Sequence, residues 1–144
     1  MFTRSCGGRT RTPQELGLPQ VAYPYFSVTC AACQTDPVRW KRKLSSEDVA
    51  LLSEKGEAGR LAVCRRLGWN AVPSNNFTVG GTESEVTIEG LGQGHGIGLC
   101  QRGAQAMAAG HASVREILVH YFPRTKLMNI AAPAGTAAQA ESPP

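Results

Sequence analysis

The sequence has no apolar run approaching the ~20 residues that a membrane-spanning helix requires. Its first ten residues, MFTRSCGGRT, lack the apolar segment of a signal peptide, and no internal repeat is visible. We therefore expect neither a membrane span nor an export signal in this chain. What is present, 144 residues of which 42% are hydrophobic, is typical of one globular domain with a buried core.

Charge is spread unevenly along the chain. Residues 1–66 hold 11 Lys and Arg against 6 Asp and Glu, and residues 67–144 hold 4 against 5. The densest cationic stretch is RWKRK, residues 39–43. Such a patch is able to bind nucleic acid or another anionic polymer. The interpretation we favour is the solvated face of a strand with Trp40 turned inward, so no specific nucleic-acid partner is expected.

Short strands and short helices are predicted to alternate, which indicates an α+β fold. Strands are predicted at 23–29 and 38–44, and a hairpin at 77–79 and 85–89. Capping residues and apolar spacing predict the helices, which begin near Thr12, Ser45 and Ser113 and also cover 60–67 and 99–109.

These elements predict a single mixed domain over residues 1–129. Residues 130–144, rich in Ala and Pro, are predicted to form a disordered tail. The chain opens directly on an expected strand end and a Gly-Gly turn, so we expect the domain to lack its N-terminal portion.

The chain has five cysteines, and an odd count argues against a complete disulfide framework. Cys30 and Cys33 form a CxxC pair and Cys6 is a possible third ligand, which together predict a metal site. No fourth ligand is obvious, because the three histidines lie far along the chain. A redox pair and a disulfide are the alternatives. Cys64, in the apolar run LAVC, is expected to be a buried small hydrophobe.

Residues 90–98, GLGQGHGIG, contain five alternating glycines between a predicted strand and a predicted helix. The spacing matches neither the dinucleotide fingerprint nor a phosphate-binding loop, and the segment is not the polar, Ser-rich composition of a linker. Alternate glycines permit positive φ and close backbone approach, and a helix start adds free N–H groups. His95 is the residue there that can carry a proton near neutral pH. Both a structural and a substrate-facing role are open for it.

Two motifs resemble those of a known family. GQGHGIGLCQRGAQAMA (92–108) and SCGGRT (5–10) are similar to signatures of the stage II sporulation protein D and amidase-enhancer family. YPYFSV (23–28), PSNNF (73–77) and REILVHYFP (115–123) follow in the family's order, so the resemblance covers about residues 2 to 127.

The resemblance implies a peptidoglycan enzyme. Characterised members are lytic transglycosylases that cut glycan strands whose stem peptides an amidase has removed. One protonated Glu gives its proton to the glycosidic oxygen and then helps the sugar's 6-hydroxyl close an anhydro ring. No second carboxylate nucleophile and no cofactor is required. The residues implied to shape the cleft are Ser5, Gly7, Gly8, His95 and Gln101.

The chain departs from the family pattern in its acid. The family's catalytic Glu precedes the Gly-Gly turn and has no counterpart here, so this chain is expected to be inactive alone. Glu89, beside the glycine segment, is the one local substitute. The other glutamates have ordinary expected roles: Glu15 and Glu116 cap helices, and the exposed ones are Glu54, Glu57, Glu83 and Glu141.

The resemblance also bears on metal, partners and location. Some members use cysteines from the same regions as metal ligands, which favours a structural zinc at Cys6, Cys30 and Cys33, although Thr3 stands where some members have His. The implied partners are peptidoglycan glycan strands and a cell-wall amidase, in the cell envelope or outside the cytoplasmic membrane. A non-catalytic wall-binding or amidase-stimulating module is the alternative function.

Overall fold

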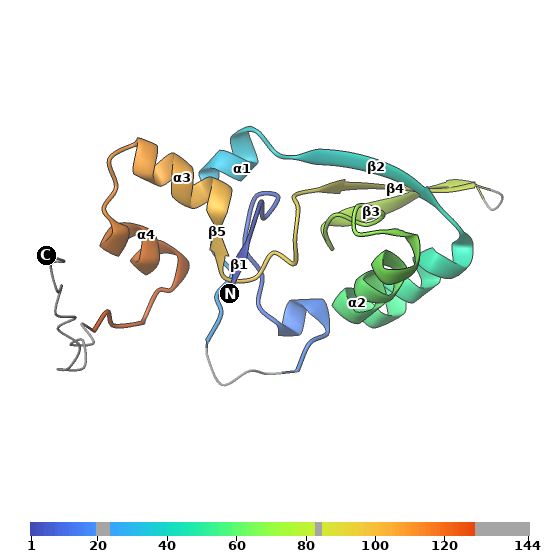
Figure 1. Ribbon diagram of the computed structural model, residues 1–144, viewed down its shortest axis with the longest axis horizontal. Coiled ribbons are helices and arrows are strands. Elements are labelled where there is room, and N and C mark those ends of the chain that lie inside the picture. The colour runs from blue at the N-terminus through green and yellow to red at the C-terminus, as the bar shows by residue number, and fades with distance from the viewer. Residues whose placement is uncertain (20–23, 83–84, 129–144) are drawn as a thin grey trace, which may run out of the picture.

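A computed structural model describes residues 1–19, 24–82 and 85–128 and confirms the α+β class (Figure 1). The predicted tail, residues 130–144, lies outside these ranges. The elements in chain order are β1 (Phe2–Thr3), the 3-10 turn η1 (Gln14–Leu16), α1 (Ala31–Thr35), β2 (Arg39–Leu44), α2 (Ser46–Leu67), β3 (Phe77–Thr82), β4 (Glu85–Leu91), β5 (Leu99–Cys100), α3 (Gln101–Ala109) and α4 (Val114–Tyr121).

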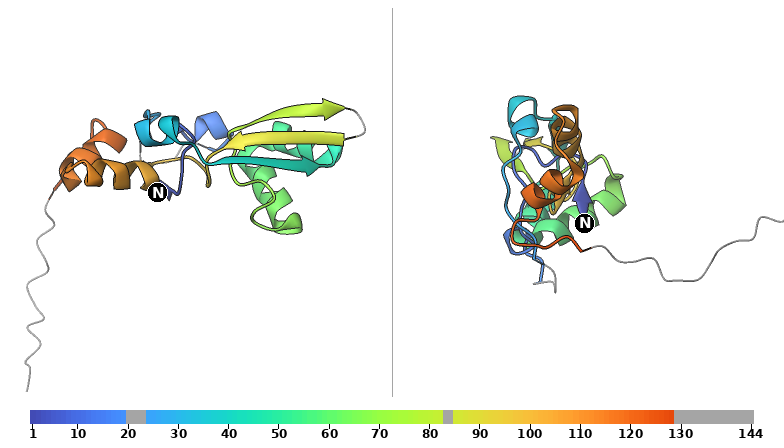
Figure 2. Two further views of the ribbon diagram at one scale, coloured as in Figure 1. Left: turned by 90° about the horizontal axis from the view of Figure 1, so that it is seen from above. Right: turned by 90° about the vertical axis from the view of Figure 1, so that its left-hand side faces the viewer.

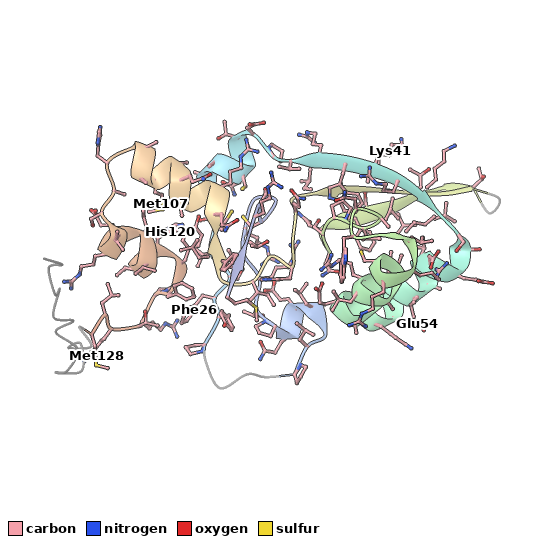
Figure 3. The ribbon with its side chains drawn as sticks, in the orientation of Figure 1. Phe26, Lys41, Glu54, Met107, His120 and Met128 are labelled. Carbon is pink, nitrogen blue, oxygen red and sulfur yellow. The ribbon has the colours of Figure 1, made fainter. Side chains whose placement is uncertain are left out.

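One end of the molecule is an antiparallel sheet of order β2-β4-β3 with α2 packed on one face (Figure 1). The pairing register aligns Trp40, Gly90 and Phe77 in one row across the sheet. Trp40 is 8% exposed and packs in the core beneath the sheet, which confirms its predicted inward orientation. Lys41 points away from α2 (Figure 3). The other face of the sheet is therefore polar, as the alternation along β2 predicts.

Helix α2 runs over the two helical segments that the sequence predicts separately. It begins as expected, because the Ser45 side chain accepts a hydrogen bond from the Asp48 N–H at 3.2 Å. Gly56 kinks the helix with φ 50° and ψ −124°. A Cβ at Gly56 would lie 2.6 Å from the Leu16 carbonyl oxygen, so the kink lets η1 pack tightly against the helix.

The other end is built around the short parallel pair of β1 with β5, surrounded by α1, α3 and α4 (Figures 1 and 2). Its core consists of Cys6, Cys30, Cys33, Cys100, Ile117 and Tyr121. The glycine segment joins the two ends, since it leaves β4 and enters β5. Its glycines at 92, 94, 96 and 98 all have positive φ, between 77° and 102°, which confirms the backbone that the alternation predicts.

Local signals predict the caps and the hairpin correctly. Ser113 and Glu116 form a reciprocal capping box on α4, and β3 pairs with β4 in a hairpin that continues through Gly80 and Gly81. The helix expected over 99–109 begins at Gln101 instead, because Leu99 and Cys100 pair with β1.

The strand predicted at 23–29 does not form in its described part. Only Thr29 makes a β-bridge, to Arg9. Backbone pairing is confined to this bridge and its two flanking bonds, from the Thr10 N–H to the Val28 carbonyl at 2.8 Å and from the Cys30 N–H to the Gly8 carbonyl at 2.9 Å. Beyond it the Thr10 hydroxyl satisfies the backbone, since it donates to the Phe26 carbonyl at 2.8 Å and accepts from the Val28 N–H at 2.9 Å. Tyr23 lies outside the described residues.

Helix α3 packs closely against its neighbours at Gly103. A Cβ at Gly103 would lie 1.9 Å from the Tyr121 hydroxyl and 2.5 Å from the Cys30 sulfur. We expect Gly103→Ala to lower the free energy of unfolding by about 1–3 kcal/mol, the range for overpacking a close-packed interior, measured by urea denaturation. Gly80→Ala is the control, because a Cβ at Gly80 meets nothing within 4 Å. Equal effects of the two substitutions would contradict this packing.

Candidate functional site

Four cysteines from three separate chain segments meet at the β1–β5 end. Cys6 lies in the turn after β1, Cys30 and Cys33 at the start of α1, and Cys100 at the junction of β5 and α3. Their sulfur atoms lie within 4.8 Å of one another and all four residues are at most 2% exposed. Sulfur atoms are visible where β1, α1 and α3 converge (Figure 3). The predicted Cys6, Cys30 and Cys33 are thus brought together, and Cys100 is the candidate fourth ligand that the sequence did not reveal.

The cluster fits a tetrahedral metal ion. Zinc–sulfur bonds of ~2.3 Å place thiolates about 3.8 Å apart, and the sulfur atoms of Cys33 and Cys100 are 3.6 Å apart. Hydrogen-bond donors surround the sulfurs, as in the outer shell of metal sites. The Cys6 N–H donates to the Cys100 sulfur at 3.4 Å, the Tyr121 hydroxyl donates to Cys30 at 3.5 Å, and the Ser5 hydroxyl lies 3.4 Å from Cys33. The four thiols can therefore hold a metal.

Hydrogen bonds among three of the cysteines shift the pKa values of their thiols in opposite directions. Hydrogen bonds from Cys100 and Cys6 lower the pKa of Cys30 well below the usual range. Cys100, as donor to Cys30, has its pKa raised to about 11, and the pKa of Cys6 is raised by its hydrogen bonds to Cys100 and Cys30. Burial raises the pKa of Tyr121, and Cys30 adds to this. Further thiolates need a positive charge at the centre.

The fifth cysteine is separate from this cluster. Cys64 is 1% exposed and packs in the core between α2 and the sheet. This confirms the interpretation of Cys64 as a buried small hydrophobe.

A polar cleft lies beside the cysteine cluster. It has a volume of about 560 Å³ and is lined by Arg4, Ser5, Gln93, Gln101, Arg102 and Gln105, with Val38 at one side. Ser5 and Gln93 exchange two backbone hydrogen bonds of 3.0 and 2.7 Å, and the Arg102 N–H donates to the Arg4 carbonyl at 3.2 Å. The cleft thus joins Ser5 from the first motif to Gln101 from the second, and Gln93 is a lining residue that the sequence did not single out.

Gly7 and Gly8 shape the turn that carries Ser5 and Cys6 and do not line this cleft. Their φ angles are 72° and 118°, which favour glycine. A Cβ at Gly7 would lie 2.7 Å from the Leu91 carbonyl oxygen, and the Asn76 side chain donates to the Gly7 carbonyl at 3.2 Å. The turn is held against the end of β4 by this close approach.

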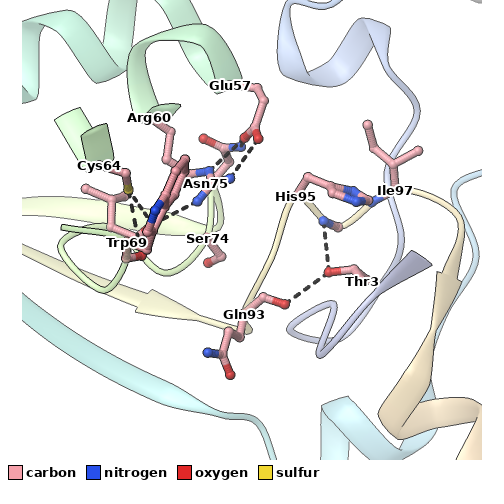
Figure 4. Close-up of polar contacts among 12 residues, drawn as sticks. Thr3, Glu57, Arg60, Cys64, Trp69, Ser74, Asn75, Gln93, His95 and Ile97 are labelled. Carbon is pink, nitrogen blue, oxygen red and sulfur yellow. Dashed lines mark hydrogen bonds and ion pairs between the residues drawn. The ribbon is translucent and has the colours of Figure 1, made fainter. Parts of the chain in front are cut away.

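His95 lies outside the lining of the cleft. Its Nδ1 accepts a hydrogen bond from the Ile97 N–H at 2.9 Å, so the neutral ring carries its proton on Nε2. Burial lowers the pKa of His95 below 6.5, and Arg60 adds to this, whereas Glu57 acts in the opposite direction. In Figure 4, Gln93 and His95 leave the glycine segment in different directions.

Glu57 is buried, at 6% exposure, and its predicted exposure is wrong. Two hydrogen bonds of 2.7 and 2.8 Å join its carboxylate to the Arg60 guanidinium, and Asn75 also donates to it (Figure 4). Arg60 donates to the Val72 carbonyl at 3.1 Å. The spacing of three residues on a helix was the available signal for the pair. The network fixes the loop before β3 against α2.

Three other glutamates have the roles that the sequence predicts, namely two helix caps and one exposed side chain. Glu15 accepts from the Thr12 N–H at 2.8 Å and Glu116 caps α4, while Glu54 is exposed.

Glu89 lies on the open face of the sheet, where its side chain is 60% exposed and 2.5 Å from the Lys41 ammonium. A general acid must be protonated at working pH and is usually shielded from water, an environment that Glu89 lacks. Glu83 and Glu141 lie outside the described residues.

Comparison with known proteins gives two partial relatives. No protein-family model matches the chain. An uncharacterized protein of Brachyspira hyodysenteriae is 29% identical over an alignment of 151 residues, which covers 84% of this chain and 40% of that protein. The amidase enhancer of Bacillus subtilis is 43% identical over 61 residues, 42% of this chain and 9% of that protein. The chain thus spans less than half the length of these relatives, and the likeness to the amidase-enhancer family is partial.

The environment of His95 predicts a pH dependence of stability. Because its folded pKa is lowered, the unfolded chain binds more protons below about pH 6.5, and stability is lost as the pH falls through that value. His95→Asn keeps an acceptor for the Ile97 N–H but does not titrate. We expect its melting temperature to fall less between pH 7.5 and 5.5 than that of the unsubstituted chain. His111→Asn, at an exposed histidine, is the control and should leave the full fall in place.

Proposed function

We propose that this chain binds peptidoglycan glycan strands in the cleft between Ser5 and Gln101, as part of a protein that acts on the cell wall outside the cytoplasmic membrane. The observation that carries the proposal is the meeting of both sequence motifs in one polar cleft. The likeness to the amidase enhancer of Bacillus subtilis supports it. Side-chain amides and a hydroxyl suit the amide and hydroxyl groups of amino sugars. No helix among the described residues is long and apolar enough to cross a membrane.

We propose that the reaction is lytic transglycosylation of glycan strands freed of their stem peptides. The chemistry needs one protonated carboxylic acid near the glycosidic oxygen. The described carboxylates do not meet this need: Glu57 is ion-paired with Arg60, Glu89 is exposed, and the lining of the cleft contains no carboxylate among the described residues. We propose instead, as the resemblance to the family implies, that the acid lies on a segment outside these 144 residues, with this chain as one wall of the site.

The division between binding and cleavage is testable with the chain as it stands. We expect it to retain peptide-free glycan strands in a pull-down and to release no anhydro-sugar ends, measured by mass spectrometry. Gln101→Ala should weaken binding about tenfold, the size of one charge-free hydrogen bond with its desolvation cost. Gln14→Ala, at an exposed glutamine of η1 that does not line the cleft, is the matched control. Release of anhydro ends by this chain would contradict an acid outside it, and loss of that release in Glu89→Gln would assign the acid to Glu89.

A second candidate function is stimulation of a cell-wall amidase without glycan cleavage. The name of the Bacillus subtilis relative favours it. The two candidates differ in one readout, the anhydro-sugar ends formed by the whole protein. Amidase stimulation without such ends would favour the second candidate over the first.

We further propose that a structural zinc ion occupies the cysteine cluster, held by Cys6, Cys30, Cys33 and Cys100. Four buried thiolates with no open position match closed structural sites rather than catalytic ones. The ion would join three chain segments and neutralise charge that burial otherwise opposes. It would take no part in the reaction.

Zinc content and stability test this assignment. We expect one zinc per chain by metal analysis, and a chelator should lower the melting temperature by more than about 10 °C. Cys100→Ser should lose both the zinc and the response to chelator. Cys64→Ser is the matched control, because Cys64 is equally buried but lies in the other core. A zinc-free chain whose Cys30 and Cys33 resist thiol labelling until reduced would support a disulfide instead.

A further inference from the structure

We propose that Arg4 and Arg102 recognise a sugar-linked carboxylate, the group that a muramic acid residue exposes once its stem peptide has been removed. The inference rests on the proposed glycan-binding function. It adds which chemical group of the glycan the cleft selects. The juxtaposition that carries it is two arginines, joined by a backbone hydrogen bond, in the lining of a cleft whose other described lining residues are uncharged.

The two arginines are held next to each other by the fold. Arg4 follows β1 and Arg102 lies in the first turn of α3, and a 3.2 Å hydrogen bond from the Arg102 N–H to the Arg4 carbonyl joins their backbones. Both side chains line the cleft with Gln93, Gln101 and Gln105. Their positions are thus set by the pairing of β1 with β5 rather than by a flexible loop.

The positive charge of the cleft favours an anionic ligand. Arg4 is exposed and has no acidic partner among the described residues. Arg102 is paired with Asp36, whose side chain is 78% exposed. An exposed pair of this kind is weak, so a ligand carboxylate can compete for the remaining donors of the Arg102 guanidinium. Guanidinium groups bind carboxylates through paired hydrogen bonds.

The same arrangement discriminates between two forms of the glycan. In a strand that carries stem peptides, this carboxyl group is tied up in an amide and has no charge. Binding that form leaves Arg4 without an anionic partner and Arg102 with Asp36 alone, and it places a peptide at the mouth of the cleft. The glutamine amides remain suited to either form, so selectivity depends on the two arginines.

The test compares two ligands that differ only in this charge. Peptide-free glycan strands are used as prepared, or after their carboxyl groups have been converted to methylamides. Dissociation constants are measured by calorimetry for the unsubstituted chain, Arg4→Gln, Arg102→Gln and Arg65→Gln. Arg65 is an exposed cation on α2 that does not line the cleft, so Arg65→Gln is the charge-matched control. Urea denaturation verifies that each variant is folded.

We expect the unsubstituted chain and Arg65→Gln to bind the carboxylate form at least about tenfold more tightly than the methylamide form, as one charge-assisted hydrogen bond implies. Arg4→Gln should reduce this ratio to about twofold or less. Arg102→Gln should have a smaller effect, because Asp36 shares its guanidinium.

Each contrary result has a distinct meaning. Equal binding of both glycan forms by the unsubstituted chain would overturn the carboxylate assignment and leave the proposed function standing. Binding of neither form would overturn the proposed function itself. A preference that survives in Arg4→Gln and in Arg102→Gln would also overturn the assignment. So would binding of a DNA oligonucleotide as tight as that of the carboxylate glycan, since the cleft would then respond to phosphate charge alone.

Discussion

Contact among four buried cysteines is the constraint on which this end of the molecule depends. The cluster joins residues separated by up to 94 positions along the chain, and three of its cysteines lie next to residues that line the cleft. Cys6 follows Ser5 directly, Cys100 precedes Gln101 directly, and Cys33 lies against the Ser5 hydroxyl. The cleft is thus formed by the outer neighbours of the cluster. The shape of the cleft therefore depends on how the four sulfur atoms pack together.

The opposite end depends on a different buried contact, between Glu57 and Arg60. This pair orders the loop that leads into β3, and Asn76 in that loop fixes the Gly7 carbonyl. The turn at Gly7 and Gly8 is therefore held from both ends of the molecule. Cys6 anchors it in the cysteine cluster, and Asn76 binds it from the loop before β3. This explains how an α+β domain of short elements positions one polar cleft.

Local sequence signals predicted much of the fold. The capping residues of α2 and α4, the β3–β4 hairpin and the positive φ angles of the glycine segment depend on residues close in sequence. The strand predicted at 23–29 failed because a distant threonine hydroxyl satisfied its backbone. Cys100 was not recognised as a member of the cysteine cluster for a related reason, since the other three cysteines lie in distant segments. Glu57 was predicted to be exposed although Arg60, three residues along the same helix, offered a local signal for the buried pair.

The candidate site shows the same limit. The motif that contains His95 was recognised, but which of its alternating side chains faces the cleft depends on how the backbone turns between the two cores. The structure lines the cleft with Gln93 and directs His95 elsewhere. The alternating glycines identified the segment at residues 90–98. Which of its side chains faces the cleft follows from long-range packing.

The alternation of the glycine segment has a consequence for its length. Residues on opposite sides of this segment serve different neighbours: Gln93 the cleft, and His95 a separate, partly buried site. Removing or adding one residue at the start of this segment would bring glycines to the positions of Gln93 and His95 and side chains to positions where φ is positive and the backbone packs closely. The segment between β4 and β5 is therefore a spacer of fixed length.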